Sequence, residues 1–318
     1  MCWAARCTPW RSKPPRLRNS PVRYRPFGNA GVAVSAISLS LQDQPRLKAD
    51  DWRKLIFAAL ENGVNSFEFD GVSPALMEGA TEAFSTVERR LLFIGWRLRA
   101  QSDRALKAEA IHDMIEQALD RTGLGYLDVA TIDDPDANDF PTETLEHLKA
   151  VRSARLVRTL AVAGGGDKFD AYVASGLFEA MATPFNLASG WVERNRVRAA
   201  MGREIAVIGL DFWPHALRDD RKAFLPKPSL WRRRTDPLAD VGGYAFLHDT
   251  HGWTPQQICL AYALTEPSLA TVQITASTPA ELADLAAIAE RDLPTGCSAQ
   301  IEMARFSAQE AERNKRRA

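Results

Sequence analysis

Helical and strand-like segments alternate along almost the whole chain, and this alternation constrains the fold more than any other feature. Residues 50–63 carry apolar side chains at helical spacing and end in Asn62-Gly63. A buried-strand pattern at 64–69 follows, then a second helical pattern at 74–84 and an apolar run at 91–98. This order is typical of parallel βα units. Their chemistry lies at the carboxyl ends of the strands, which here are Glu68 to Ser73 and Arg97.

The same alternation continues to the end of the chain and predicts eight strand-helix units after one hairpin. Hairpin strands are expected at 22–27 and 32–34, around a turn at 28–31. Further strands are expected at 36–41, 64–69, 91–98, 126–132, 157–163, 184–189, 204–210 and 270–274. Helices are expected at 50–63, 74–84, 107–122, 142–151, 167–175, 191–201, 255–266 and 279–290.

Eight such units favour an α/β fold, a (β/α)₈ TIM barrel that forms a single domain over 22–318. A long loop, 212–240, follows the seventh strand. The competing architecture is an open doubly wound sheet. It is disfavoured because no Gly-x-Gly-x-x-Gly follows the first strand. The first 21 residues lie outside the barrel pattern: they are basic, contain prolines at 9, 14, 15 and 21 and no acid, and are expected to be a disordered extension.

Composition excludes several functional classes. The chain of 318 residues is 46% hydrophobic and 25% charged with zero formal net charge, which argues against a nucleic-acid or membrane-surface protein. No apolar run approaches the roughly 20 residues of a membrane-spanning helix. Four cysteines and five histidines are scattered without metal-ligand spacing. We therefore expect no metal site and a cytoplasmic protein.

Four local motifs make the chain resemble the aldo/keto reductase family from Tyr24 to about Leu293. The segment 24–35 is similar to the family's opening hairpin, and 62–69 to its second strand. The segment 126–135, Tyr-Leu-Asp-Val-Ala-Thr-Ile-Asp-Asp-Pro, resembles its fourth strand. The segments 253–264 and 276–282 resemble its last helix pair. The resemblance implies an NADP(H)-dependent oxidoreductase of carbonyl compounds with a catalytic tetrad of Asp, Tyr, Lys and His.

All four tetrad positions are substituted in this chain. Glu68 stands at the Asp position, Ser73 at the Tyr position, Arg97 at the Lys position and Asp133 at the His position. A serine hydroxyl has a far higher pKa than a phenol near 10, so Ser73 is a poor proton donor. Arg97 keeps a positive charge but does not deprotonate. We therefore expect Glu68 and Arg97 to form an ion pair in the barrel mouth.

The family's cofactor groove is altered as well. The positions that hold the nicotinamide amide in the family carry Ala163, Gly164 and Asn186 here, and the stacking tyrosine is replaced by Leu210. In the last loop, Glu281 stands near the position of the arginine that binds the 2′-phosphate. The helix start at Thr278 still offers backbone N–H groups to an anion.

Two functional hypotheses remain open on the sequence. In the first, the barrel has lost ordinary reductase activity and serves as a pseudoenzyme with a binding or regulatory role toward an unidentified small molecule. In the second, it is an active enzyme, either a residual NAD(P)H oxidoreductase or a protein with a new acid-base activity that uses Glu68, Arg97 and Asp133.

Overall fold

The predicted barrel is present. The computed structural model describes residues 23–99, 108–133, 142–218 and 244–315. Eight parallel strands close into a barrel in the order β10-β3-β4-β5-β6-β7-β8-β9. They are β3 (Ile37–Leu41), β4 (Ser66–Phe69), β5 (Phe93–Leu98), β6 (Leu127–Asp133), β7 (Val157–Ala163), β8 (Ala180–Pro184), β9 (Ala206–Leu210) and β10 (Thr271–Ile274).

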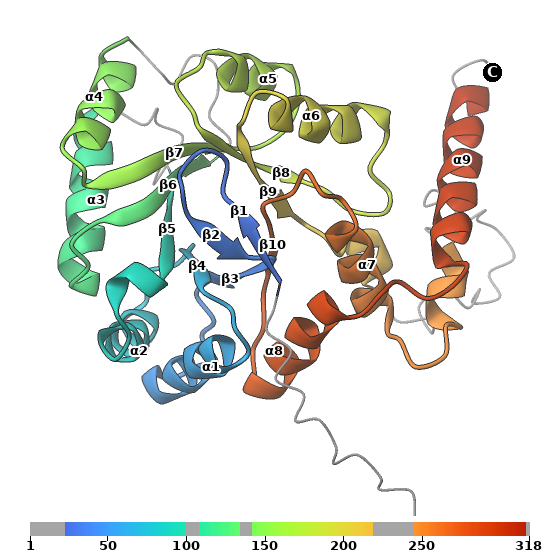
Figure 1. Ribbon diagram of the computed structural model, residues 1–318, viewed down its shortest axis with the longest axis horizontal. Coiled ribbons are helices and arrows are strands. Elements are labelled where there is room, and N and C mark those ends of the chain that lie inside the picture. Colours follow the sequence, from blue (N-terminus) through green and yellow to red (C-terminus); the bar gives the residue numbers. More distant parts are fainter. Residues whose placement is uncertain (1–22, 100–107, 134–141, 219–243, 316–318) are drawn as a thin grey trace, which may run out of the picture.

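Helices surround the barrel in the order that the alternation predicts (Figure 1). They are α1 (Ala49–Glu61), α2 (Pro74–Ser85), α3 (Ala108–Thr122), α4 (Thr142–Ser153), α5 (Asp167–Ala174), α6 (Trp191–Met201), α7 (Pro255–Leu264) and α8 (Pro279–Ala286). Each lies in the expected segment because its apolar residues face the outside of the strands. For example, Trp52, Leu55, Ile56 and Ala59 of α1 are buried.

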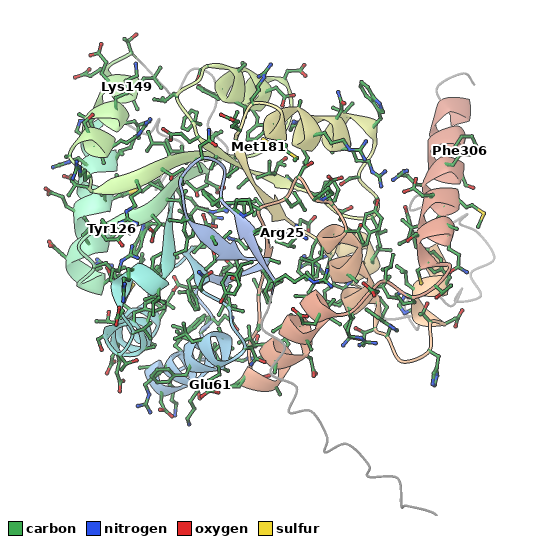
Figure 2. All side chains as sticks on the ribbon, viewed as in Figure 1. Arg25, Glu61, Tyr126, Lys149, Met181 and Phe306 are labelled. Carbon is green, nitrogen blue, oxygen red and sulfur yellow. The ribbon has the colours of Figure 1, made fainter. Side chains whose placement is uncertain are left out.

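The N-terminal hairpin lies across the end of the barrel at which the strands begin. Strands β1 (Tyr24–Pro26) and β2 (Ala33–Ser35) pair antiparallel around the predicted turn. Gly28 has φ of +50°, and a Cβ there would lie 3.0 Å from the carbonyl oxygen of Glu204, so the turn approaches the barrel too closely for a side chain. Arg25 donates from Nη1 and Nη2 to the carbonyls of Leu264, Glu266 and Leu269, which fixes the hairpin to the α7–β10 connection (Figure 2).

Two sequence-based expectations are wrong. The sixth barrel strand covers Ala180–Pro184 and not 184–189. Its residues Ala180, Met181 and Ala182 are buried, but alanine has low strand preference, so the strand was not recognised in the sequence. The helix α9 (Cys297–Lys315) was not expected at all. Figure 1 shows α9 standing at the side of the barrel, and its Phe306 is 69% exposed.

Other parts of the expected architecture fall beyond the described ranges. The basic extension at 1–21 lies outside the described residues, and so does 219–240 of the expected long loop. The described start of that loop contains a short 3₁₀ turn, His215–Leu217, and a second one, Tyr244–His248, lies beyond the predicted end of the loop. A 3₁₀ turn, Ala287–Glu290, also ends the segment predicted as one helix over 279–290.

The hydrophobic core has two parts. The larger one packs the outer faces of the strands against the helices, with residues such as Ile37, Leu39 and Trp52 fully buried. The smaller one lies inside the barrel and combines Phe27, Phe93 and Val129 with five alanines of β7, β8 and β9, namely Ala161, Ala163, Ala180, Ala182 and Ala206.

Candidate functional site

Three consecutive strands bring charged side chains together at the carboxyl end of the barrel. Glu68 is on β4, Arg97 on β5 and Asp133 at the end of β6. The register pairs Glu68 with Gly95, and Arg97 with Thr131. Side chains at positions i and i+2 of a strand share one face, so all three point into the barrel. Gly95 leaves room for Glu68, since a Cβ there would lie 3.3 Å from Cγ of Glu68.

Arg97 joins the two carboxylates. Its Nη2 lies 2.8 Å from Oε2 of Glu68, and its Nη1 lies 3.1 Å from Oδ1 of Asp133. The Arg97 and Glu68 side chains are only 5% and 4% exposed. Gln273 of β10 also donates to Oε2 of Glu68. The predicted ion pair between Glu68 and Arg97 is therefore present.

The protonation states of this pair follow from its surroundings. Burial opposes ionisation of Glu68, but the charge of Arg97 and its hydrogen bond outweigh burial and lower the pKa of Glu68 below its ordinary value. Burial likewise opposes the charge of Arg97, and the carboxylates of Glu68 and Asp133 overcome it and raise the pKa of Arg97. Both side chains are therefore charged at neutral pH.

Asp70 and Arg99 extend this group of three charged residues. We call the five residues Glu68, Asp70, Arg97, Arg99 and Asp133 the mouth cluster. Nε of Arg99 lies 2.6 Å from Oδ2 of Asp133, and its Nη2 lies 3.0 Å from Oδ1 of Asp70. Burial of the Asp70 carboxyl raises its pKa, and Arg97 and Arg99 oppose that effect. With both arginines and all three acids ionised, the cluster would carry one surplus negative charge.

Asp70 and Arg99 were missed by the sequence analysis although a signal was present. Each lies two residues beyond a predicted site residue, Glu68 or Arg97, and strand periodicity places positions i and i+2 on one face. Gln273 was missed too. It is the polar residue in an otherwise strand-like run, Thr271-Val-Gln-Ile274, at an inward position.

Ser73 is separate from this cluster. It precedes α2 as its N-cap residue. Its backbone N–H donates to Oδ1 of Asp43 at 2.8 Å, and Val72 donates to the other oxygen of the same carboxylate. These hydrogen bonds hold the β4–α2 loop to the β3–α1 loop. Within the described residues no hydrogen bond joins Ser73 to Arg97 or Glu68.

The positions expected to hold the nicotinamide have other contacts. Ala163 ends β7, and the backbone N–H of Gly164 donates to the carbonyl of Ala182. Asn186 follows β8 and does not lie on it, in contrast to the expectation. Its Nδ2 donates to the carbonyl of Asp211 at 3.1 Å, and its Oδ1 accepts from the N–H of Ala188 at 3.0 Å. Both ends of this amide are used within the protein.

The positions expected to hold the stacking ring and the phosphate also differ from a dinucleotide site. Leu210 ends β9 and packs against the inner core. At the start of α8, Thr278 accepts a hydrogen bond from the N–H of Glu281 at 3.2 Å. The Glu281 carboxylate in turn accepts from the N–H of Ser277 at 2.9 Å. This helix start is therefore already supplied with a negative group of its own.

Within the described ranges, no group of three or more His, Cys, Asp or Glu residues is placed to hold a metal ion. None of the helices described is long and apolar enough to cross a bilayer.

Comparison with solved structures identifies the fold. The chain superimposes on an aldo-keto reductase from Bacillus halodurans, in its apo form, with a TM-score of 0.67 and 15% sequence identity, covering 91% of this chain and 95% of that one. It also superimposes on a Pseudomonas aeruginosa protein classed with the aldo-keto reductases, with a TM-score of 0.61 and 15% identity over 84% and 93% of the two chains. No protein-family model and no curated protein matches the sequence. The barrel thus has the aldo-keto reductase fold.

Proposed function

We propose that this chain is a diverged member of the aldo/keto reductase family that does not perform carbonyl reduction and acts instead as a binding or regulatory protein for a small molecule. One observation carries this proposal. Arg97, which stands where the family has its lysine, is held on both sides by carboxylates, Glu68 at 2.8 Å and Asp133 at 3.1 Å. Its guanidinium is therefore occupied by two structural ion pairs.

The chemistry of carbonyl reduction supports the same conclusion. Reduction requires a proton donor beside the carbonyl oxygen, and general acids work best with a pKa near the operating pH. Ser73 has a much higher pKa than a phenol, and Arg97 does not release its proton. Asp133 of the mouth cluster stands where the family has an imidazole, and Ser73, outside the cluster, stands where the family has a phenol.

The residues at the cofactor positions do not fit NADP(H) as the family binds it. A nicotinamide would have to compete for the Asn186 amide with two hydrogen bonds inside the protein. A 2′-phosphate would meet the Glu281 carboxylate at the start of α8. We therefore derive no reaction step through this cofactor. The scattered cysteines support a reducing, cytoplasmic setting as part of the proposal.

A second candidate is an enzyme that uses acid-base chemistry at the mouth cluster. It is favoured by Glu68 and Asp70, whose pKa values are displaced in opposite directions within one cluster. Carboxyl pairs of this kind divide the acid and base roles in several enzyme classes. Asp133, with a side chain 26% exposed, would be the carboxylate open to a substrate.

The test compares the purified full-length protein with an active aldo/keto reductase measured alongside. NADPH binding is followed by quenching of tryptophan fluorescence, and turnover by oxidation of NADPH with 4-nitrobenzaldehyde. Loss of a general acid typically lowers rates by about 10² to 10⁴, so turnover near background is expected. Turnover at the rate of the active reductase would refute the proposal. An activity found in a hydrolase or lyase screen and lost in Asp70→Asn would favour the second candidate.

A further inference from the structure

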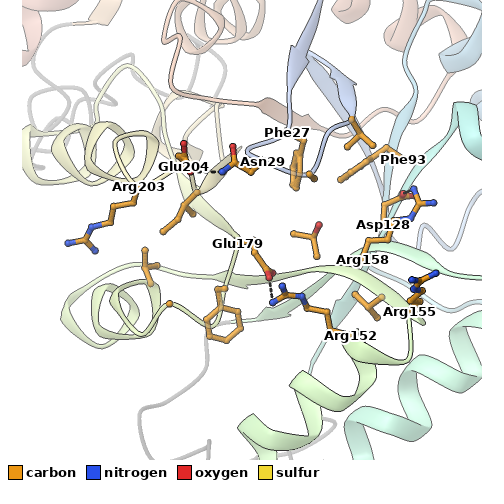
Figure 3. A pocket seen from close by; sticks show the side chains of 18 of the residues that line it. Phe27, Asn29, Phe93, Asp128, Arg152, Arg155, Arg158, Glu179, Arg203 and Glu204 are labelled. Atoms are coloured by element: carbon orange, nitrogen blue, oxygen red, sulfur yellow. Dashed lines mark hydrogen bonds and ion pairs between the residues drawn. The ribbon is translucent and has the colours of Figure 1, made fainter.

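A large pocket lies at the end of the barrel opposite the mouth cluster. Its volume is about 950 Å³, which is the size of a site for a small organic molecule. The hairpin turn, the first residues of β6 and β7, the end of α5 and the α6–β9 turn line it (Figure 3). Nothing in the mouth cluster contributes to this pocket.

The wall nearest the barrel axis is apolar. Phe27 of the hairpin and Phe93 of β5 lie with their ring centroids 4.6 Å apart and are almost fully buried. Val157, at the start of β7, and Phe178, just before β8, also line the pocket but belong to the outer core. A hydrocarbon group placed against these side chains would leave water, and the burial of apolar area is favourable.

Tyr126 and Arg158 form one side of the pocket, and Arg89, which does not line the pocket, also stacks on the Tyr126 ring. The guanidinium carbons of Arg89 and Arg158 each lie 3.9 Å from the ring centroid of Tyr126. Both arginines also contact the Asp128 carboxylate, Arg89 at 2.7 Å and Arg158 at 3.3 Å. Asp128 is only 3% exposed and accepts a further hydrogen bond from the N–H of Ile94. One buried carboxylate thus serves two guanidinium groups.

The residues that line the pocket include more arginines than acids. Arg152 pairs with Glu179, and Glu204 accepts a hydrogen bond from Asn29. No ion pair within the described residues involves Arg155 or Arg203, which lie on opposite sides of the pocket in Figure 3. Four arginines line the pocket (Arg152, Arg155, Arg158, Arg203) together with three acids (Asp128, Glu179, Glu204), although the whole chain has zero net charge.

The backbone at Arg155 adds an independent observation. Its φ is +61°, in the left-handed region, and it follows the last turn of α4, where glycine is usually favoured. The sequence instead holds a long cation there, at the rim of the pocket. Strained positions of this kind are enriched at binding sites.

We propose that this pocket binds an amphipathic organic anion, a carboxylate or phosphate monoester with an apolar body. The anionic group would lie between Arg155 and Arg158. The apolar body would lie against Phe27, Phe93 and Phe178. Guanidinium groups form bidentate hydrogen bonds with both kinds of anion. The N-terminal segment 1–22 is not a complementary occupant, because it contains arginines and no acid. This proposal is independent of whether the mouth cluster is catalytic.

The experiment uses the full-length protein with three probes of one chain length: decanoate, decyl phosphate and the uncharged decanol. Binding is measured by calorimetry at low and high salt. The variants are Arg155→Gln, Arg203→Gln, their double variant, and Ala30→Trp, which would fill the pocket from the hairpin turn. Arg90→Gln is the surface control, since Arg90 is 80% exposed and lies outside the pocket. Arg99→Gln tests binding at the mouth instead.

We expect one or both anions to bind more tightly than decanol, and salt to weaken that binding. The better anion identifies the head group. Arg155→Gln should weaken binding of that anion by about tenfold, as expected for loss of one charge-assisted contact. Ala30→Trp should abolish the binding, and both control variants should bind as the wild type does. Three results would each overturn the proposal. They are no binding of either anion at millimolar concentration, binding that Arg99→Gln alone removes, or binding that survives both the double variant and Ala30→Trp.

Discussion

Arg97 and Glu68 form an ion pair inside the barrel mouth, with Nη2 and Oε2 2.8 Å apart and both side chains at most 5% exposed. A pair so deeply buried stabilises the fold mainly through mutual compensation, because each charge alone would be costly to bury. This relationship lies at the positions that would carry catalysis in the family that the sequence resembles. It therefore offers a direct way to separate a structural role from a catalytic one.

The first prediction concerns removal of one partner. Arg97→Met leaves the Glu68 carboxylate buried beside an apolar side chain, and we expect the free energy of unfolding to fall by roughly 3 to 5 kcal/mol. The double variant Glu68→Gln with Arg97→Met leaves no uncompensated charge at this pair and should recover most of that loss. Urea denaturation of the wild type, both single variants and the double variant measures the coupling. Additive losses would mean that the two residues do not stabilise each other.

The second prediction concerns pH. The pKa of Glu68 is lowered in the folded state, chiefly because the charge of Arg97 outweighs burial. Its contribution to stability is therefore fully present above the pKa of an unfolded glutamate, about 4.3, and is lost as the pH falls through the folded value. The difference in unfolding free energy between wild type and Glu68→Gln should shrink as the pH is lowered below about 4.3.

Asp70 provides the control of opposite sign. Burial raises its pKa in the folded state, so the folded protein holds the Asp70 proton more tightly than the unfolded chain does. The contribution of the protonated Asp70 carboxyl to stability is present at low pH. It is lost as the pH rises from about 3.9, the pKa of an unfolded aspartate, through the pKa in the folded state. Asp70→Asn should consequently gain stability relative to wild type as the pH rises through that window. Parallel profiles for Glu68→Gln and Asp70→Asn would contradict both assignments.

The fold and the centre of the candidate site could be predicted because each rests on local patterns. Helix and strand periodicity placed the elements and put Arg97 at the end of one strand, and short motifs placed Glu68 and Asp133 at the ends of two others. The sixth strand was misplaced because its alanines fill the barrel interior, where small size and not strand preference decides the residue. The helix α9 escaped because Met303 and Phe306 are exposed while Ile301 and Ala304 are buried, so its apolar residues do not mark one face.

The pocket at the opposite end could not be predicted from spacing. Its lining comes from the hairpin turn, three strand starts and two helix ends, which only the closed barrel brings together. Arg155 in particular looks like an ordinary surface cation in the sequence. Its left-handed backbone and the shared use of Asp128 by Arg89 and Arg158 appear only in the folded chain.

The third prediction uses the backbone at Arg155. Because its φ of +61° suits glycine better than arginine, Arg155→Gly should leave the free energy of unfolding unchanged or raise it by up to about 1 kcal/mol. The same variant should weaken anion binding at the pocket, since the guanidinium is gone. Thermal unfolding and calorimetry with decanoate or decyl phosphate measure the two effects. A clear loss of stability would show that the Arg155 side chain holds the fold together.

The fourth prediction concerns the close contact between α1 and α2, the helix that follows β4. Gly79 is fully inside α2, and a Cβ there would lie 2.3 Å from the carbonyl oxygen of Ala49 and 2.8 Å from Cβ of Trp52. Helix propensity alone favours Gly79→Ala by roughly 1 kcal/mol. The clash with backbone costs more, since overpacking typically costs about 1 to 3 kcal/mol and this contact offers no flexible side chain to move. We expect a net loss of about 1 to 2 kcal/mol in the free energy of unfolding, measured by urea denaturation.

Gly202→Ala is the matched control for Gly79→Ala. A Cβ at position 202 would have its nearest neighbour 3.6 Å away, so this variant should be neutral or slightly stabilising. Stabilisation by Gly79→Ala comparable with that of Gly202→Ala would mean that the two helices do not approach each other as closely as described.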